Sequence, residues 1–125
     1  MRQGSFALAL KGAEAAISNG RSILIFPEGT RGSGDHLLPF RPGIGYLQRR
    51  SQLPVLPIHL WGTHHILPKG RTLPKGRRVL VTIGKLMPNE RFSEAVRGKR
   101  VTRAYQGVAE LVRNEIMRLA DPTIR

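Results

Sequence analysis

The sequence predicts an α/β domain in which a mixed, largely parallel sheet is flanked by helices. A helical pattern, a glycine turn and a continuous apolar run follow one another over residues 5–26, two more apolar runs come later, and an amphipathic helix follows them. Short strands without polar alternation are typical of sheets covered on both faces, and their mixture with helices is typical of α/β domains. At 125 residues we predict one domain, residues 1–125.

The first helix is predicted over residues 5–19. Apolar residues recur there at helical spacing: Phe6, Leu10, Ala13 and Ile17. Asn19-Gly20 offers a stop, because both residues tolerate the left-handed conformation found at helix ends. The apolar run 22–26 then predicts a buried strand, which ends at Pro27.

A polar loop with three glycines follows over residues 28–35. Pro42-Gly43 precedes a predicted short helix containing Ile44, Tyr46 and Leu47. A second buried strand is predicted over residues 55–61, and Pro57 within it requires an edge position or a bulge because proline donates no hydrogen bond.

The remaining chain is predicted to hold a basic loop, a strand and a long helix. Residues 62–78 form the loop and residues 79–84 the third strand. The last helix is predicted over residues 102–119. Its apolar residues share one face: Ala104, Val108, Leu111, Val112, Ile116 and Leu119. Asp121-Pro122 would end it.

The charge is strongly basic and unevenly placed. The formal net charge is +13, from 21 Lys and Arg against 8 Asp and Glu, and no acidic residue stands between Asp35 and Glu90. The basic residues of that stretch are Arg41, Arg49, Arg50, Lys69, Arg71, Lys75, Arg77, Arg78 and Lys85. Such a surface suits an anionic partner, whether a phosphate ligand, a nucleic acid or an acidic lipid leaflet.

Composition also excludes several classes of site. With no cysteine the chain has neither disulfides nor a thiolate metal site. The longest uncharged stretch, between Ser51 and Lys69, is interrupted by prolines and histidines, so we expect no transmembrane segment.

The loop that leaves strand 22–26 carries the residues best suited to bind a phosphate. Ligands of open α/β sheets bind beyond the carboxyl ends of the strands. Arg31 offers a charged fork, Thr30 a hydroxyl, and Gly29 a sharp turn that exposes backbone N–H groups. Glu28 could orient Arg31 or accept a hydrogen bond from a substrate hydroxyl. From residue types alone, a surface turn with a local Glu–Arg pair is the favoured explanation of the loop, because Pro-Glu-Gly-Thr is also typical of turns.

Three blocks in order closely resemble the PlsC-like glycerolipid acyltransferases, the family of lysophosphatidate and glycerol-3-phosphate acyltransferases. They are Ile-Phe-Pro-Glu-Gly-Thr-Arg at 25–31, Leu-Pro-Phe-Arg-Pro-Gly-Ile-Gly-Tyr at 38–46 and Leu-Pro-Val-Leu-Pro-Ile at 53–58. The resemblance implies that Glu28, Gly29, Thr30 and Arg31 bind the acceptor phosphate. It implies a donor-side or site-shaping role for Pro54 and Pro57, and more weakly places Arg2 at the arginine of a further block.

The catalytic histidine of that family is followed five positions later by an aspartate, which orients it as the base that deprotonates the acceptor hydroxyl. Five residues after His36, His59, His64 and His65 stand Arg41, His64, Lys69 and Gly70, so this chain has no such pair. We therefore expect the chain to be the C-terminal, acceptor-binding portion of an acyltransferase domain, incomplete at its N-terminus.

The histidines themselves offer two weaker alternatives. His64 or His65 could replace the missing base, although no carboxylate stands near them to orient one. A metal site formed by His59, His64 and His65 lacks a nearby carboxylate or thiol to complete its ligands, so we predict no metal. His36 is expected to face solvent.

The predicted function is transfer of a fatty acyl group to the hydroxyl of a phosphate-bearing glycerolipid such as lysophosphatidate, or of glycerol phosphate. Acyl-CoA or acyl carrier protein is the expected co-substrate, with no further cofactor. The basic loop could rest on an anionic membrane at its cytoplasmic face, or bind the phosphates of coenzyme A or the acidic surface of acyl carrier protein. A solvated loop that keeps the protein soluble explains its charge equally well.

Two other functions fit the charge or the missing pair. One is a small basic nucleic-acid-binding protein, but aromatic residues make up only 6% of the chain and no stacking motif or zinc finger is present, so we do not expect nucleic acid as a partner. The other is a catalytically inactive acyltransferase remnant that binds lysophospholipid without turnover.

Overall fold

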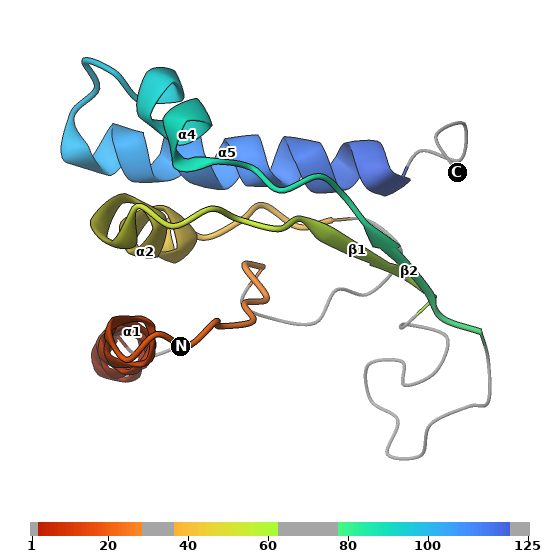
Figure 1. Ribbon diagram of the computed structural model, residues 1–125, viewed down its shortest axis with the longest axis horizontal. Coiled ribbons are helices and arrows are strands. Elements are labelled where there is room, and N and C mark those ends of the chain that lie inside the picture. The colour runs from red at the N-terminus through yellow and green to blue at the C-terminus, as the bar shows by residue number, and fades with distance from the viewer. Residues whose placement is uncertain (1–2, 29–36, 63–77, 121–125) are drawn as a thin grey trace.

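The computed structural model describes residues 3–28, 37–62 and 78–120 and has the predicted α/β class. Within them the order is α1 (Gln3–Ser18), α2 (Gly43–Ser51), β1 (Ile58–Trp61), β2 (Leu80–Ile83), α4 (Asn89–Ala95) and α5 (Val101–Ala120). Figure 1 shows α4 lying against α5, α2 and the strands along the other side of α5, and α1 beyond α2, seen nearly end-on. The predicted helices 5–19 and 102–119 are confirmed to within two residues, and the predicted short helix containing Ile44, Tyr46 and Leu47 is confirmed as α2.

The core lies between α2, α4 and α5. The apolar spacing of α5 buries Ala104, Val108, Ala109, Val112 and Ile116. Phe92 from α4 is fully buried and Met87, which precedes α4, is nearly so. Gly45 brings α2 unusually close to α5, because a Cβ at this position would overlap the backbone of Tyr105. This core therefore depends on a backbone-to-backbone approach as well as on apolar side chains.

The two strands pair antiparallel, with Ile58 opposite Ile83 and Trp61 opposite Leu80. Val55 and Met87 form a separate bridge. Two residues separate Val55 from β1 while three separate β2 from Met87, so the register shifts by one residue beside Pro57. The bulge or edge position predicted at Pro57 is confirmed as this shift.

The antiparallel direction differs from the largely parallel arrangement that we predicted for the sheet. A parallel pair needs a long crossover, usually a helix. The connection 62–78 is rich in proline, glycine and basic residues and has no helical spacing of apolar residues. Its composition suits a loop between antiparallel strands.

The predicted strand 22–26 is wrong in the described structure. Residues 21–26 have no regular secondary structure, and Leu24 and Phe26 are 76% and 67% exposed. Ile25, between them, packs against the core. The segment thus keeps the alternation of a strand but has no strand beside it among the described residues, and a strand is stable only when its backbone is paired.

Helix α4 is missing from the sequence prediction. It has seven residues, follows Pro88 and carries Glu90 in its first turn, which are both start signals. Phe92 is its one buried residue, so no helical period was visible. In the described part of the chain, no helix has both the length and the apolar character required to cross a bilayer.

Candidate functional site

Two hydrogen bonds join the ends of the polar loop that leaves residues 21–26. The backbone N–H of Arg41 donates to the carbonyl oxygen of Pro27 at 2.9 Å. The backbone N–H of Leu38 donates to Oε2 of Glu28 at 2.8 Å. The second bond is strengthened by the charge of the carboxylate. Glu28 therefore ties the start of the loop to its end, across ten positions of sequence.

A third contact reaches the same place from α5. Arg113 donates from Nε to the carbonyl oxygen of Leu38 at 3.1 Å and from Nη2 to that of Leu37 at 2.9 Å. The peptide groups around Leu38 thus have partners on both sides, Glu28 for the N–H and Arg113 for the carbonyls. We call these contacts among Pro27, Glu28, Leu37–Arg41 and Arg113 the loop base.

The loop base rests on the hydrophobic core. Ile25, Leu37 and Phe40 are partly buried and pack against the core cluster that includes Phe92 and Val108. Both ends of the loop are therefore held by apolar packing as well as by hydrogen bonds. A rigid support of this kind is what a loop needs if it is to present a ligand site.

Of the four residues predicted to bind phosphate, the structure describes Glu28. Gly29, Thr30 and Arg31 lie outside the described residues, as does Arg2. One carboxylate oxygen of Glu28 accepts the hydrogen bond from Leu38, a role that we did not predict. Its proposed contacts with Arg31 or a substrate hydroxyl remain predictions.

The two predicted prolines differ in burial. Pro57 is fully buried beside β1, and its carbonyl oxygen accepts a hydrogen bond from the N–H of Gly84 at 2.9 Å. A Cβ on Gly84 would come within 3.0 Å of both Pro57 and Leu119, so these residues form a tight junction between the strands and α5. Pro54 is exposed. The geometry of Pro57 fits a shaping role, whereas that of Pro54 leaves its side chain open to solvent.

Among the predicted histidines, the structure describes His59. It is 6% exposed and lies in β1 opposite Thr82. His36, His64 and His65 fall outside the described residues. In the described ranges no three His, Cys, Asp or Glu side chains gather as metal ligands.

Comparison with known proteins gives a consistent result. The Acyltransferase family model matches residues 2–61. The 1-acyl-sn-glycerol-3-phosphate acyltransferase of Limnanthes alba is 42% identical over 67 residues, which are 54% of this chain and 23% of that protein. That of Chlamydomonas reinhardtii is 30% identical over 98 residues, which are 77% of this chain and 30% of that protein.

The fold agrees with a solved member of the same group. The crystal structure of PlsC, the 1-acyl-sn-glycerophosphate acyltransferase of Thermotoga maritima, superposes with a TM-score of 0.70 and 26% identity, over 94% of this chain and 45% of that one. In sequence and in fold, this chain is similar to the PlsC-like acyltransferases. The similarity spans less than half the length of each of these three proteins.

Arg113 is the residue of the loop base that sequence reasoning missed. It lies in the predicted last helix, 75 positions from Leu38. A single arginine within an amphipathic helix gives no local signal of such a contact, since charged residues are usual on the solvent face. The sequence could not distinguish it from the other arginines of α5.

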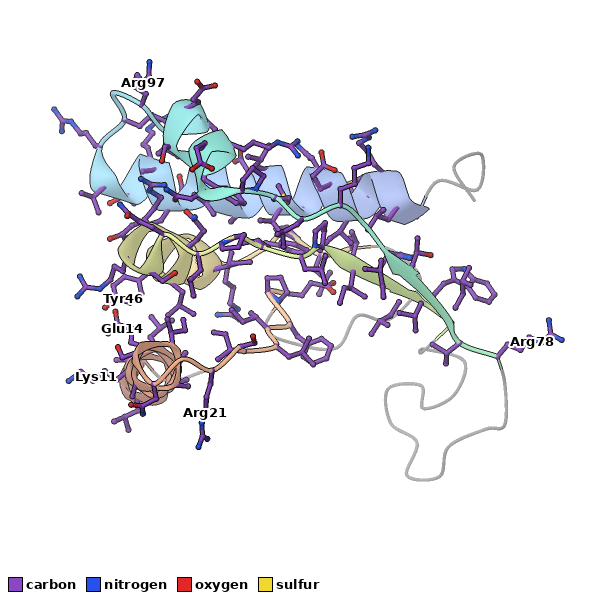
Figure 2. All side chains as sticks on the ribbon, in the orientation of Figure 1. Lys11, Glu14, Arg21, Tyr46, Arg78 and Arg97 are labelled. Carbon is purple, nitrogen blue, oxygen red and sulfur yellow. The ribbon has the colours of Figure 1, made fainter. Side chains whose placement is uncertain are left out.

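A second polar cluster, separate from the loop base, attaches α1 to α2. Glu14 of α1 pairs with Nε of Arg50 at 2.6 Å, and the Arg50 guanidinium lies 5.2 Å from the ring centroid of Tyr46. Tyr46 in turn packs edge-on against Tyr105 at 5.8 Å. Figure 2 shows Glu14 and Tyr46 next to each other between α1 and α2.

These contacts shift the protonation of both acidic groups. The hydrogen bond with Tyr46, helped by Arg50, holds the pKa of Glu14 below its ordinary value of 4.5. The same hydrogen bond raises the pKa of Tyr46 above 10.0. At neutral pH Glu14 is therefore ionised and Tyr46 protonated, so the pair links α1 to α2.

Proposed function

We propose that this chain provides the acceptor-binding part of a lysophosphatidate acyltransferase. The observation that carries the proposal is the family match over residues 2–61, because this stretch contains all three blocks at 25–31, 38–46 and 53–58. The relatives named above are acyltransferases of 1-acyl-sn-glycerol-3-phosphate. The tied and supported loop base, which carries the first block, is consistent with a loop that holds an anionic headgroup.

In the proposed reaction the acceptor hydroxyl attacks the carbonyl carbon of an acyl thioester. A C–O bond forms, the C–S bond breaks, and the thiol leaves with the proton that the hydroxyl gave up. The guanidinium of Arg31 and the hydroxyl of Thr30 hold the acceptor phosphate, and Gly29 allows the backbone to turn around it. The proton-accepting His-x4-Asp pair of the family has no counterpart in this chain, so these residues supply binding and orientation.

The acyl donor in this proposal is acyl-CoA or acyl carrier protein, and the acceptor lies in an anionic membrane surface. The net charge of +13 favours such a surface, since each basic residue near anionic lipid contributes about 1 kcal/mol. Figure 2 shows Arg78, just before the start of β2, on the side of the strands away from the helices. We propose that this side rests on the cytoplasmic face of a membrane.

The test separates recognition of a phosphate monoester from general attraction to negative charge. The chain is titrated with phosphatidylcholine vesicles that contain lysophosphatidate, and with vesicles matched in surface charge that contain phosphatidylglycerol. We expect tighter binding to lysophosphatidate. Arg31→Ala should weaken that binding roughly 10- to 100-fold, which is the cost of losing a hydrogen bond between charged groups.

Arg97→Ala is the matched control. Arg97 is exposed in the turn after α4, and its substitution removes the same single positive charge. It should weaken binding to both vesicles slightly and equally. The proposal fails if the unaltered chain binds both vesicles alike, or if Arg31→Ala behaves like Arg97→Ala. Tight, sequence-selective binding to DNA or RNA at physiological salt would instead favour the nucleic-acid alternative.

A further inference from the structure

Arg113, just past the middle of α5, connects this helix to the loop base. Its two hydrogen bonds go to consecutive carbonyl oxygens, those of Leu37 and Leu38, at 2.9 and 3.1 Å. The side chain is partly buried. A planar guanidinium presents several donors at fixed angles and so can serve two adjacent acceptors at once, which the single ammonium of lysine does less well.

The two carbonyl groups that Arg113 binds lie next to the backbone group that Glu28 binds. Leu38 is also the residue whose N–H is held by Glu28 at the start of the loop. Arg113 therefore fixes the peptide groups to which Glu28 is tied. Since α5 packs its apolar face into the core, Arg113 couples Glu28, through Leu38, to a helix that the core holds in place.

We infer that Arg113 is a positioning residue for phosphate binding, acting through the loop base on the Glu28–Arg31 block. The inference rests on the proposed function, because it concerns the same acceptor phosphate. A loop already held near its bound conformation loses less conformational freedom when the ligand binds, and its affinity for that ligand is higher. Arg113 would thus contribute to recognition of a phosphate monoester without touching it.

The competing explanation is that Arg113 acts only through its positive charge or only through stability. Three variants separate these. Arg113→Leu removes both donors and the charge, and Arg113→Lys keeps the charge but not the fork. Arg103→Leu removes a charge at an exposed position of the same helix and serves as the control.

Two measurements are made on each full-length variant. The first is hydrogen exchange at the Leu38 amide, which reports on the loop base without any ligand. The second is the ratio of the dissociation constants for lysophosphatidate and phosphatidylglycerol vesicles matched in surface charge, with the midpoint of thermal unfolding recorded beside it.

We expect faster exchange at Leu38 and a loss of about tenfold in the preference for lysophosphatidate in Arg113→Leu, roughly the effect of one charge-assisted hydrogen bond. Arg113→Lys should lose at least a few-fold of that preference, and Arg103→Leu should retain it in full.

Unchanged exchange at Leu38 in Arg113→Leu would overturn the inference, as would an equal loss of affinity for both vesicles that follows the unfolding midpoint. Full retention of the preference in Arg113→Lys would overturn it in favour of charge alone. If the unaltered chain shows no preference for lysophosphatidate, the proposed function fails first and takes the inference with it. Failure confined to the Arg113 variants leaves the proposed function standing.

Discussion

Two apolar parts of this molecule have different surroundings. The residues of α2, α4 and α5 that face one another are buried almost completely, with Phe92 and Val108 at 0% exposure. The run 22–26 is at least as apolar in sequence, yet Leu24 and Phe26 are mostly exposed. The difference shows that apolar composition indicates a tendency to be buried, while burial itself requires a partner that covers the side chain.

Other exposed apolar residues lie on β1 and β2. They include Leu60, Trp61, Leu80, Val81 and Ile83. The core helices and this strand region thus form a well-covered and a poorly covered part of the same chain. Substitutions that are chemically alike should therefore have different effects in the two parts.

The largest contrast is expected between two phenylalanines. Phe92→Ala should lower the free energy of unfolding by about 3–5 kcal/mol, because it leaves a cavity in the core. Phe26→Ala should change it by less than about 0.5 kcal/mol, since the ring is 67% exposed. Urea unfolding of both variants measures the two values. Comparable losses would show that residues 21–26 are as well covered as the core.

Two glycines sharpen the comparison within the helices. Gly45→Ala should destabilise the protein by about 1–3 kcal/mol, because the new methyl group would meet the Tyr105 backbone. Gly12→Ala in α1 has nothing within 4 Å and should stabilise by roughly 0.5–1 kcal/mol through helix propensity. Thermal unfolding followed by circular dichroism should move in opposite directions. A stabilising Gly45→Ala would contradict the close approach of α2 and α5.

The smallest expected effect concerns how α1 is attached. The pKa of Glu14 is lowered in the folded protein, so its contribution is present above the ordinary value of 4.5 and is lost as pH falls through the lower, folded value. Glu14→Gln should therefore reduce stability at neutral pH and have a vanishing effect in strong acid. Urea midpoints across the acid range check this, with Glu110→Gln, at an exposed position of α5, as control. A difference between Glu14→Gln and the unaltered chain that grew on acidification would refute it.

Local sequence signals were sufficient for most of the regular structure. The helices α1, α2 and α5 follow the helical spacing of apolar residues, and Pro57 marks the register shift beside β1. These features depend on neighbours within a few positions. The seven-residue α4 is too short to show a period, and the strand predicted at 22–26 depends on pairing that no local pattern contains.

The candidate site also has a part that the sequence predicted and a part that it could not predict. The block Glu28–Arg31 could be found from the sequence, because its residue types and order suit a phosphate and match a family. The partner of Glu28 at Leu38 and the contacts of Arg113 could not. Each depends on where the chain places two peptide groups relative to a side chain far away in the sequence.

By itself, the sequence determined the resemblance to the acyltransferases, the basic character and the periodicity of the long helices, since these follow from residue identity and short-range spacing. The tertiary structure alone decided which apolar residues are covered, the direction of the strand pair, and which arginine holds the loop base. The physical reason is that burial and long-range hydrogen bonds form only between groups that folding brings together.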